Sequence, residues 1–408
     1  MPVSEIDVQP IPPHVPSDLV RYWEAARAPG GDRDPFGAVM PLRDGPPIFY
    51  SPFAHKGEPS WVVARHDLIR EVFQDATTFS SAGSSGVDKL LNEDLALIPL
   101  EKDHPDHEKF RLLLNPLFSP RHIAAIEDGV RTTARQLIRE IRDAGECDFS
   151  AQFGSPFPVT VFLRLMGLPL DHMAGFLEWG RGLLHPVSPD DRLNSARAIR
   201  DYLQKQIAGE RGVQGEGFMN HVANARIEGE CLSDQDALGV CYLLFVAGLD
   251  TVASTLSFIF KHLAEHPKDR KLLCDDPELI PDAIEEFLRA YAVTTSYRRV
   301  TRDTTFHGVQ MRRGEFVALP TMLAGRDAAE FPDPDVIDFR RENLRHITFA
   351  AGPHRCIGSH LARREIRIAL VEWLAVIPDF SLAPGKTPIT YSSSVFGIHY
   401  LPLVWKAE

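Results

Sequence analysis

The segment from Ser233 to His266 constrains the fold of this chain more than any other feature. Its central stretch, CYLLFVAGLDTVASTLSFIF, is apolar nearly all round a helix, so we expect it to lie inside the protein. Ser233 and Asp236 form a start that resembles a capping box, and Pro267 stops the pattern at the other end. The sequence therefore predicts a long interior helix, about 50 Å in length.

Shorter patterns on both sides of this segment predict a mainly α-helical protein with a small β region. Apolar residues recur at helical spacing through most of residues 105–290, whereas short aromatic and β-branched runs elsewhere indicate strands. No linker or repeat divides the chain, so we expect residues 1–408 to form a single domain. The expected helices cover residues 66–75, 110–117, 123–141, 159–166, 197–207 and 359–376, residues 17–26 are compatible with a further short helix, and the expected strands cover residues 48–64, 304–307, 310–311, 316–319 and 391–404.

The charge balance of the chain argues against nucleic acid as its main partner. The 44 Lys and Arg residues stand against 56 Asp and Glu residues, a net charge of −12. The first residues show no basic segment followed by an apolar core, and no uninterrupted apolar run approaches the ~20 residues that span a bilayer. We therefore expect a cytoplasmic protein without a membrane anchor.

The five cysteines include no CxxC pair, which argues against a disulfide framework. Cys356 stands apart because of its surroundings. The other four are expected to be small apolar side chains or free thiols: Cys147, Cys231, Cys241 and Cys274.

The loop FAAGPHRCIGSHLARRE around Cys356 follows the frame FxxGxHxCxG, with Phe349, Gly352, His354, Cys356 and Gly358 at the fixed positions. Five such matches arise by chance on the order of once in ten million starting positions. The spacing suits a thiolate that binds haem iron. Gly352 allows a tight turn toward the porphyrin, and Gly358 lets a helix begin whose N–H groups face the sulfur. Phe349 would shield the sulfur, and His354 would donate to a propionate. An ordinary buried cysteine remains the alternative.

A polar interruption, Ala247-Gly248-Leu249-Asp250-Thr251, lies in the middle of the long helix. Polar residues and a glycine inside an otherwise apolar helix are locally unfavourable and often mark a functional site. Thr251 can bond the carbonyl of Ala247, which would bend or open the helix, and Gly248 would leave room for a ligand. The groove would hold dioxygen and water, with Asp250 and Thr251 relaying protons to the oxygen. The alternative is a kink with a satisfied Thr and an Asp paired elsewhere.

Several charged residues have spacings that suit buried pairs or carboxylate binding. Glu286 and Arg289 are three residues apart and share one helix face. His107 and Arg111 are four apart and could grip one carboxylate together, and Arg298 is a further candidate. For each of the three cations a solvated surface position is the alternative.

Together these residues resemble the cytochrome P-450 superfamily, and the C-terminal two-thirds most resembles the bacterial camphor 5-monooxygenase group. The resemblance covers nearly the whole chain and rests on AGLDT, ExxR and FxxGxHxCxG in that order. It implies a single-domain, mainly helical triangular prism that binds haem b. It also implies roles for individual residues: Cys356 as the iron ligand, Asp250 and Thr251 as an acid–alcohol pair, Glu286 and Arg289 as a structural pair, and His107, Arg111, Arg298 and His354 at the propionates.

The resemblance also implies partners. The chain would act as a monomer on dioxygen and a small apolar substrate, with electrons from a [2Fe–2S] ferredoxin and a separate ferredoxin reductase. No reductase domain is expected in the chain itself. Arg70 and Arg111 fall where the ferredoxin would dock, whereas Glu108 replaces a basic residue of the camphor enzyme.

The pocket positions depart from the camphor enzyme, because Leu95 stands where that enzyme has a tyrosine that binds the ketone. An apolar pocket with a few hydroxyls suits a cyclic monoterpene or a norisoprenoid. Ala350 replaces a frequent glycine, and Arg181 or His185 is placed to hold Asp250. The other pocket positions implied are Leu243, Val246, Ala247, Thr294, Ser394, Val395 and Phe396.

Two other functions remain as alternatives. A haem-thiolate protein could use peroxide or catalyse a reaction without oxygenation, but such relatives usually lack the acid or the Thr. A haem-based sensor or binding protein would show no turnover with any ferredoxin.

Overall fold

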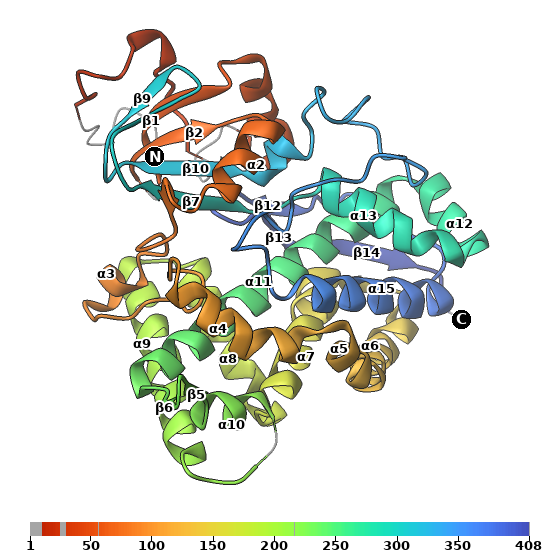
Figure 1. Ribbon diagram of the computed structural model, residues 1–408. Coiled ribbons are helices and arrows are strands. Elements are labelled where there is room, and N and C mark those ends of the chain that lie inside the picture. Colours follow the sequence, from red (N-terminus) through yellow and green to blue (C-terminus); the bar gives the residue numbers. More distant parts are fainter. Residues whose placement is uncertain (1–9, 25–29, 56, 216, 408) are drawn as a thin grey trace.

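The computed structural model describes residues 10–24, 30–55, 57–215 and 217–407. Helices fill most of the molecule, and a β-rich region lies at the upper left of Figure 1. The long helix α11 (Asp234–Glu265) runs through the middle. The predicted fold class, mainly helical with a small β region, is confirmed.

The start of α11 has the predicted cap. Ser233 Oγ accepts a hydrogen bond from the Asp236 backbone N–H at 3.0 Å and donates to the Asp236 carboxylate at 2.8 Å. By length and composition alone α11 could cross a membrane, which the search for uninterrupted apolar runs missed. It is instead a core helix, because it packs against three others: α7 (Pro156–Met166), α9 (Pro189–Glu210) and α15 (Ser359–Val376).

Two hydrophobic clusters meet along α11. The first half of the helix, from Ala237 to Phe245, packs into a cluster with α7 and α9. The second half, from Val252 to Ala264, packs into another cluster with α15. Within residues 246–251, at the junction, only Leu249 is buried. The polar interruption therefore lies where the two halves of the core meet.

A five-stranded sheet forms the β-rich region, in the order β1–β2–β10–β7–β3. The strands expected over residues 48–64 are confirmed as β1 and β2, which pair antiparallel, and β10 pairs with β2 in parallel. In the register of β10 and β7, Val317 lies opposite Arg298, which fixes Arg298 within the sheet. The strands are β1 (Ile48–His55), β2 (Glu58–Val63), β3 (Phe79–Ser80), β7 (Thr295–Val300) and β10 (Phe316–Pro320).

The C-terminal strands differ from the prediction of one continuous segment over residues 391–404. The segment is divided between two sheets, because β12 and β13 form a hairpin while β14 pairs with β11 and β4. The strands of the smaller sheets are β4 (Glu146–Asp148), β5 (Arg226–Ile227), β6 (Glu230–Cys231), β8 (Thr304–Phe306), β9 (Val309–Met311), β11 (Phe380–Leu382), β12 (Ile389–Tyr391), β13 (Gly397–Tyr400) and β14 (Pro402–Trp405).

Two predicted helices also differ. The helix expected over residues 123–141 is broken at Ile126, whose N–H bonds the Ile123 carbonyl and closes the first helix. Near residues 17–26 only a 3-10 turn forms, Ser17–Leu19, and residues 25 and 26 lie outside the described part. The remaining helices are α1 (Pro35–Val39), α2 (His66–Gln74), α3 (Val87–Leu91), α4 (Asp106–Leu114), α5 (Pro120–Ala125), α6 (Glu127–Ile141), α8 (Met173–Leu184), α10 (Phe218–Ala223), α12 (Pro267–Asp275), α13 (Ile280–Ala290) and α14 (Thr321–Ala324).

Candidate functional site

The loop that carries Cys356 is folded back on itself just before α15. The Cys356 N–H donates to the Phe349 carbonyl at 2.9 Å, and the Arg355 N–H donates to the Gly352 carbonyl at 3.1 Å. Gly352 has a φ of +70°, and a Cβ there would lie 2.5 Å from the Phe73 carbonyl oxygen. Only glycine fits this turn, as the sequence predicted.

The Cys356 sulfur lies at the N-terminal end of α15 and keeps some accessible surface. Burial raises the pKa of the Cys356 thiol, while the hydrogen bond from the Gly358 N–H and the charges of Arg111, Arg363 and Arg355 act to lower it. Because a metal ion deprotonates a thiol that it binds, these donors and charges suit a sulfur that becomes a metal-bound thiolate.

A cluster of basic residues lies beside this loop. The His107 and His354 rings are 4.1 Å apart, and His107 and Arg298 are almost fully buried. Burial lowers the pKa of His354 to about 3, helped by the charges of Arg298, His107 and Arg111. Burial also lowers the pKa of Arg298 to about 10, against the opposing charge of Asp103. His354 Nδ1 is buried without a hydrogen-bond partner. The cluster thus combines charged guanidinium groups with neutral imidazole rings that can donate hydrogen bonds, and it fits a ligand that carries carboxylates.

Arg111 has a second role in the structure. Its guanidinium donates to the Arg355 carbonyl at 2.9 Å, one residue before Cys356. It therefore braces the thiolate loop as well as adding charge to the cluster. Phe349 is half-buried beside this loop, with the Arg363 guanidinium 4.6 Å from its ring centroid.

In the middle of α11, Thr251 Oγ1 donates to the Ala247 carbonyl at 3.0 Å, as predicted. The helix nevertheless continues without interruption through this point, so the expected opening of the helix is not seen. Gly248 does not face a ligand as we expected. A Cβ there would lie 3.1 Å from the Phe162 ring, so this glycine instead allows α7 to pack closely. Ala247 is exposed although it belongs to a core helix.

Asp250 is held by two donors. The Tyr391 hydroxyl donates to Asp250 Oδ1 at 2.9 Å, and His185 Nε2 lies 3.2 Å from the same oxygen. Of the two candidates from the sequence, His185 thus makes the contact, and the structure shows no hydrogen bond between Arg181 and Asp250 within the described residues. Sequence reasoning missed Tyr391, because no local pattern connects it with a residue 141 positions away.

The predicted pocket residues fall into two groups. Thr294 and Val395 form a β-bridge, and the Thr295 N–H donates to the Ser394 carbonyl at 2.8 Å, so these segments are side by side. Leu95 and Phe396, in contrast, are fully buried in two different hydrophobic clusters. That both side chains line a pocket therefore stays a prediction. The residues that retain accessible surface are Leu243, Val246, Ala247, Thr294, Ser394 and Val395.

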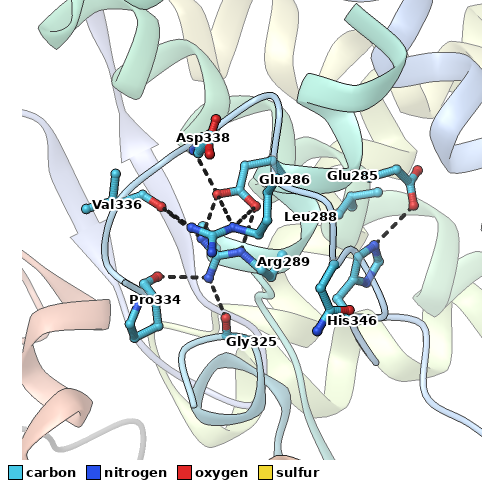
Figure 2. A network of polar contacts seen from close by, with 12 residues as sticks. Glu285, Glu286, Leu288, Arg289, Gly325, Pro334, Val336, Asp338 and His346 are labelled. Carbon is cyan, nitrogen blue, oxygen red and sulfur yellow. Dashed lines mark hydrogen bonds and ion pairs between the residues drawn. The ribbon is translucent and has the colours of Figure 1, made fainter. Parts of the chain in front are cut away.

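Glu286 and Arg289 form the predicted buried pair (Figure 2). Arg289 donates to both Glu286 carboxylate oxygens at 2.7 and 2.8 Å, and both side chains are 0% exposed. Arg341 donates to the same carboxylate at 3.0 Å, and the Asp338 N–H donates to it at 2.9 Å. Arg289 also donates to the carbonyl of Gly325 at 2.6 Å. This pair therefore ties the loop over residues 325–341 to α13.

The fold and the site define a haem-thiolate protein. Iron protoporphyrin offers one metal for Cys356 and two carboxylates for the cluster of His107, Arg298 and His354, and the buried unpartnered Nδ1 of His354 fits such an acceptor. The chain belongs to the cytochrome P450 family, because the family model described as Cytochrome P450 matches residues 193–273 and 275–403. The family implies a haem-thiolate cofactor and monooxygenase chemistry.

Relatives and solved structures agree with this assignment. The chain is 41% identical over 409 residues to the probable cytochrome P450 127A1 of Sinorhizobium fredii, which covers 98% of both chains. It is 30% identical to 20-oxo-5-O-mycaminosyltylactone 23-monooxygenase of Streptomyces fradiae, over 86% of this chain and 84% of the relative. The crystal structure of cytochrome P450 CYP101C1 superposes with a TM-score of 0.88 at 34% identity, over 98% of this chain and 100% of the other. That of CYP101J2 gives 0.87 at 32%, over 97% and 99%. The predicted likeness to the camphor hydroxylase group is confirmed.

Proposed function

We propose that this protein hydroxylates a small apolar terpenoid-like substrate, such as a cyclic monoterpene or norisoprenoid, with electrons from a [2Fe–2S] ferredoxin. The single observation that carries the chemistry is the position of Cys356, at the start of α15 and beside the buried side chains of Arg298, His107 and His354. A bound haem would supply dioxygen activation, and the charge of an axial thiolate favours O–O cleavage. Residues 1–408 would act as a single cytoplasmic domain and as a monomer.

The accessible residues near the middle of α11 support an apolar substrate. Leu243, Val246 and Ala247 offer only hydrocarbon surface, and the Thr294 hydroxyl is already engaged with Thr321, whose hydroxyl lies 3.3 Å away. Leu95, at the position where the camphor enzyme has a tyrosine, has no hydroxyl that could bind a ketone. A compact, weakly polar molecule would lose little hydration on entering such a site.

The basic surface next to the thiolate loop supports an acidic electron donor. Arg70 is exposed on α2, and Arg111 lies behind the Cys356 loop. Glu108 is 65% exposed on the same helix as Arg111 and offsets part of this charge. A hollow on α15 adds further basic residues: His360, Arg363, Arg364 and Arg367. Such a surface steers an acidic ferredoxin at low ionic strength.

The proposed proton path uses residues of α11 alone. Asp250 lies one residue before Thr251, and both side chains are partly accessible, so a proton entering at the carboxyl can pass to the hydroxyl through water. Retention of both groups supports oxygenation over the peroxide-driven or non-oxygenating alternative.

The substrate proposal can be tested by titrating the haem-loaded protein with a panel of terpenoids. A compact terpenoid that displaces water from the iron is expected to shift the spin state with micromolar affinity, and a ferredoxin–reductase pair should then convert it to an alcohol. A panel in which only large polar macrolides shift the spin state would overturn the substrate class while leaving the haem-thiolate assignment intact.

A further inference from the structure

Three elements converge on the carboxylate of Asp250. The acid lies in the middle of α11, His185 directly follows α8, and Tyr391 ends strand β12. Both partners contact the same oxygen, Oδ1, at 2.9 Å from Tyr391 and 3.2 Å from His185. The second oxygen, Oδ2, is buried without a hydrogen-bond partner. The carboxylate is thus held on one side and left free on the other.

We propose that Tyr391 is a positioning residue that, together with His185, fixes Asp250 Oδ1 so that Oδ2 stays free to pass a proton to Thr251. The proposal rests on the proposed function, because it names the residue that positions Asp250, the acid of the proposed proton path. An unfixed carboxylate could turn Oδ2 toward a donor, because a buried acceptor without a partner is unfavourable. Tyr391 and His185 together oppose that rotation.

The Tyr391 hydroxyl is suited to donate to Asp250. Burial and the negative charge of Asp250 raise the pKa of Tyr391 far above its ordinary value, so the phenol remains protonated. Ser254, one helical turn after Asp250, places its Oγ 3.2 Å from the same hydroxyl. Because the phenol can donate only one proton, Ser254 can donate to it while it donates to Asp250.

The ring of Tyr391 belongs to a cluster of three rings, with His185 and His399, that contact one another. Its centroid lies 4.1 Å from that of His185 and 4.2 Å from that of His399. Burial lowers the pKa of His399, and the charge of His185 acts in the same direction. The aromatic contacts hold the ring in place independently of its hydroxyl, so removal of the hydroxyl alone is a clean test.

The hydrogen bond from Tyr391 to Asp250 also depends on Gly397, which pairs with Tyr391 in the β12–β13 hairpin. A Cβ at Gly397 would lie 2.1 Å from the Tyr391 Oη and 2.6 Å from the Ser254 Oγ. The phenol therefore lies directly against the backbone of β13, in space that exists only because residue 397 has no side chain. Gly397→Ala is expected to displace the phenol and to reproduce the loss of the Tyr391 hydroxyl.

The test compares crystal structures and reaction coupling of haem-loaded Tyr391→Phe and its matched control Ser254→Ala. Tyr391→Phe keeps the ring and its contacts with His185 and His399 but removes the donor to Asp250, whereas Ser254→Ala removes a hydroxyl that does not contact the acid. In Tyr391→Phe we expect the Asp250 carboxylate to rotate or split into two conformers. We also expect a roughly fivefold or larger fall in product formed per NADH consumed, with β-ionone as the probe, and a larger solvent isotope effect.

An Asp250 carboxylate that stays on His185 with Oδ2 unmoved in Tyr391→Phe, and with an unchanged isotope effect, would overturn the proposal. The thermal midpoint of unfolding should change equally little in both variants. If Tyr391 had a purely structural role, Tyr391→Phe would lower this midpoint and leave the isotope effect unchanged. Asp250→Asn distinguishes failure of the proton path from failure of the positioning role of Tyr391. If it too leaves the isotope effect unchanged, the proton path fails, while the crystal structures still decide what positions the acid. Should Gly397→Ala fail to fold, Tyr391→Phe alone decides.

Discussion

Glu285 and Arg363 connect helix α13 with the helix that follows the thiolate loop. Arg363 donates to the two carboxylate oxygens of Glu285 at 2.5 and 2.8 Å, and His346 Nε2 lies 3.1 Å from one of them. The neighbouring residue Glu286 binds Arg289 and Arg341 on another side of α13 (Figure 2). Two consecutive acids therefore fasten the loops on both sides of α13 and hold Cys356 relative to the core.

The Glu285 contact predicts a specific pH dependence of stability. Burial alone would raise the pKa of Glu285, but the hydrogen bonds and charges of Arg363 and His346 lower it from an ordinary 4.5 to about 2. Because the pKa is depressed in the folded state, the stabilisation is complete above about pH 5 and is lost as the pH falls toward 2. Glu285→Gln should cost about 2 kcal/mol at pH 7, discounted for partial exposure, and progressively less in acid.

Urea unfolding of wild type and Glu285→Gln between pH 7 and pH 3 provides the measurement. Exposed Glu278, on the turn before α13, is the matched control, and its Gln variant should change stability little at any pH. A Glu285→Gln penalty that does not shrink in acid would contradict the ion-pair account.

The Glu286–Arg289 pair predicts a larger effect on stability. Glu286→Gln leaves the buried guanidinium of Arg289 without its charge partner, which typically costs 3–5 kcal/mol, so we expect low yields of haem-loaded protein or a strongly lowered unfolding midpoint. The exposed pair of Lys271 and Asp275 is the comparison, since solvent screens this pair and Lys271→Ala should change stability little. Equal costs for the two variants would refute a structural role for Glu286.

The backbone conformation of Ala350 predicts that Ala350→Gly is stabilising. It has a φ of +58°, in the left-handed region where a side chain is unfavourable and glycine is not. Ala350→Gly should therefore raise the free energy of unfolding by about 0.5–1 kcal/mol, read from denaturant midpoints. Ala351→Gly, at the next position and without a positive φ, should be neutral or destabilising. A destabilised Ala350→Gly would mean that the methyl group contributes packing that outweighs the strain.

Substitution of Thr251 should affect product formation but not substrate binding. Thr251→Ala removes the hydroxyl from the proton path but no accessible apolar surface of Val246 or Ala247, so the spin-state affinity for a terpenoid should persist. Product per NADH should fall about tenfold, with the missing electrons recovered as hydrogen peroxide. Unchanged coupling would remove Thr251 from the proposed path, and Thr255→Ala, one turn later on α11, serves as the control.

The sequence predicted those parts of the fold and site that depend on residues close together in the chain. Four such features are the cap of α11, the Thr251–Ala247 bond, the turn at Gly352 and the Glu286–Arg289 pair. Each of them involves residues only a few positions apart in the chain. Contacts across the fold were missed, as with Tyr391 on Asp250 and Arg363 on Glu285, because packing rather than local pattern brings those residues together.

The lining of the pocket depends on packing across the fold in the same way. Leu95 and Phe396 occupy positions that line the pocket in a relative, but here the Phe396 ring packs 5.5 Å from that of Phe36 and Leu95 belongs to the cluster around α7 and α9. Small shifts in how strands and loops pack decide whether such a side chain faces a cavity or the core. Neither the spacing nor the residue type records that difference.

The reduced carbon monoxide difference spectrum tests the central claim, the role of Cys356, most directly. Wild-type protein loaded with haem is predicted to show the far-red-shifted Soret band of thiolate ligation, and Cys274→Ser should keep it, whereas Cys356→Ser should lose it. Absence of that band from wild type, or its persistence in Cys356→Ser, would contradict the assignment of Cys356 as the iron ligand.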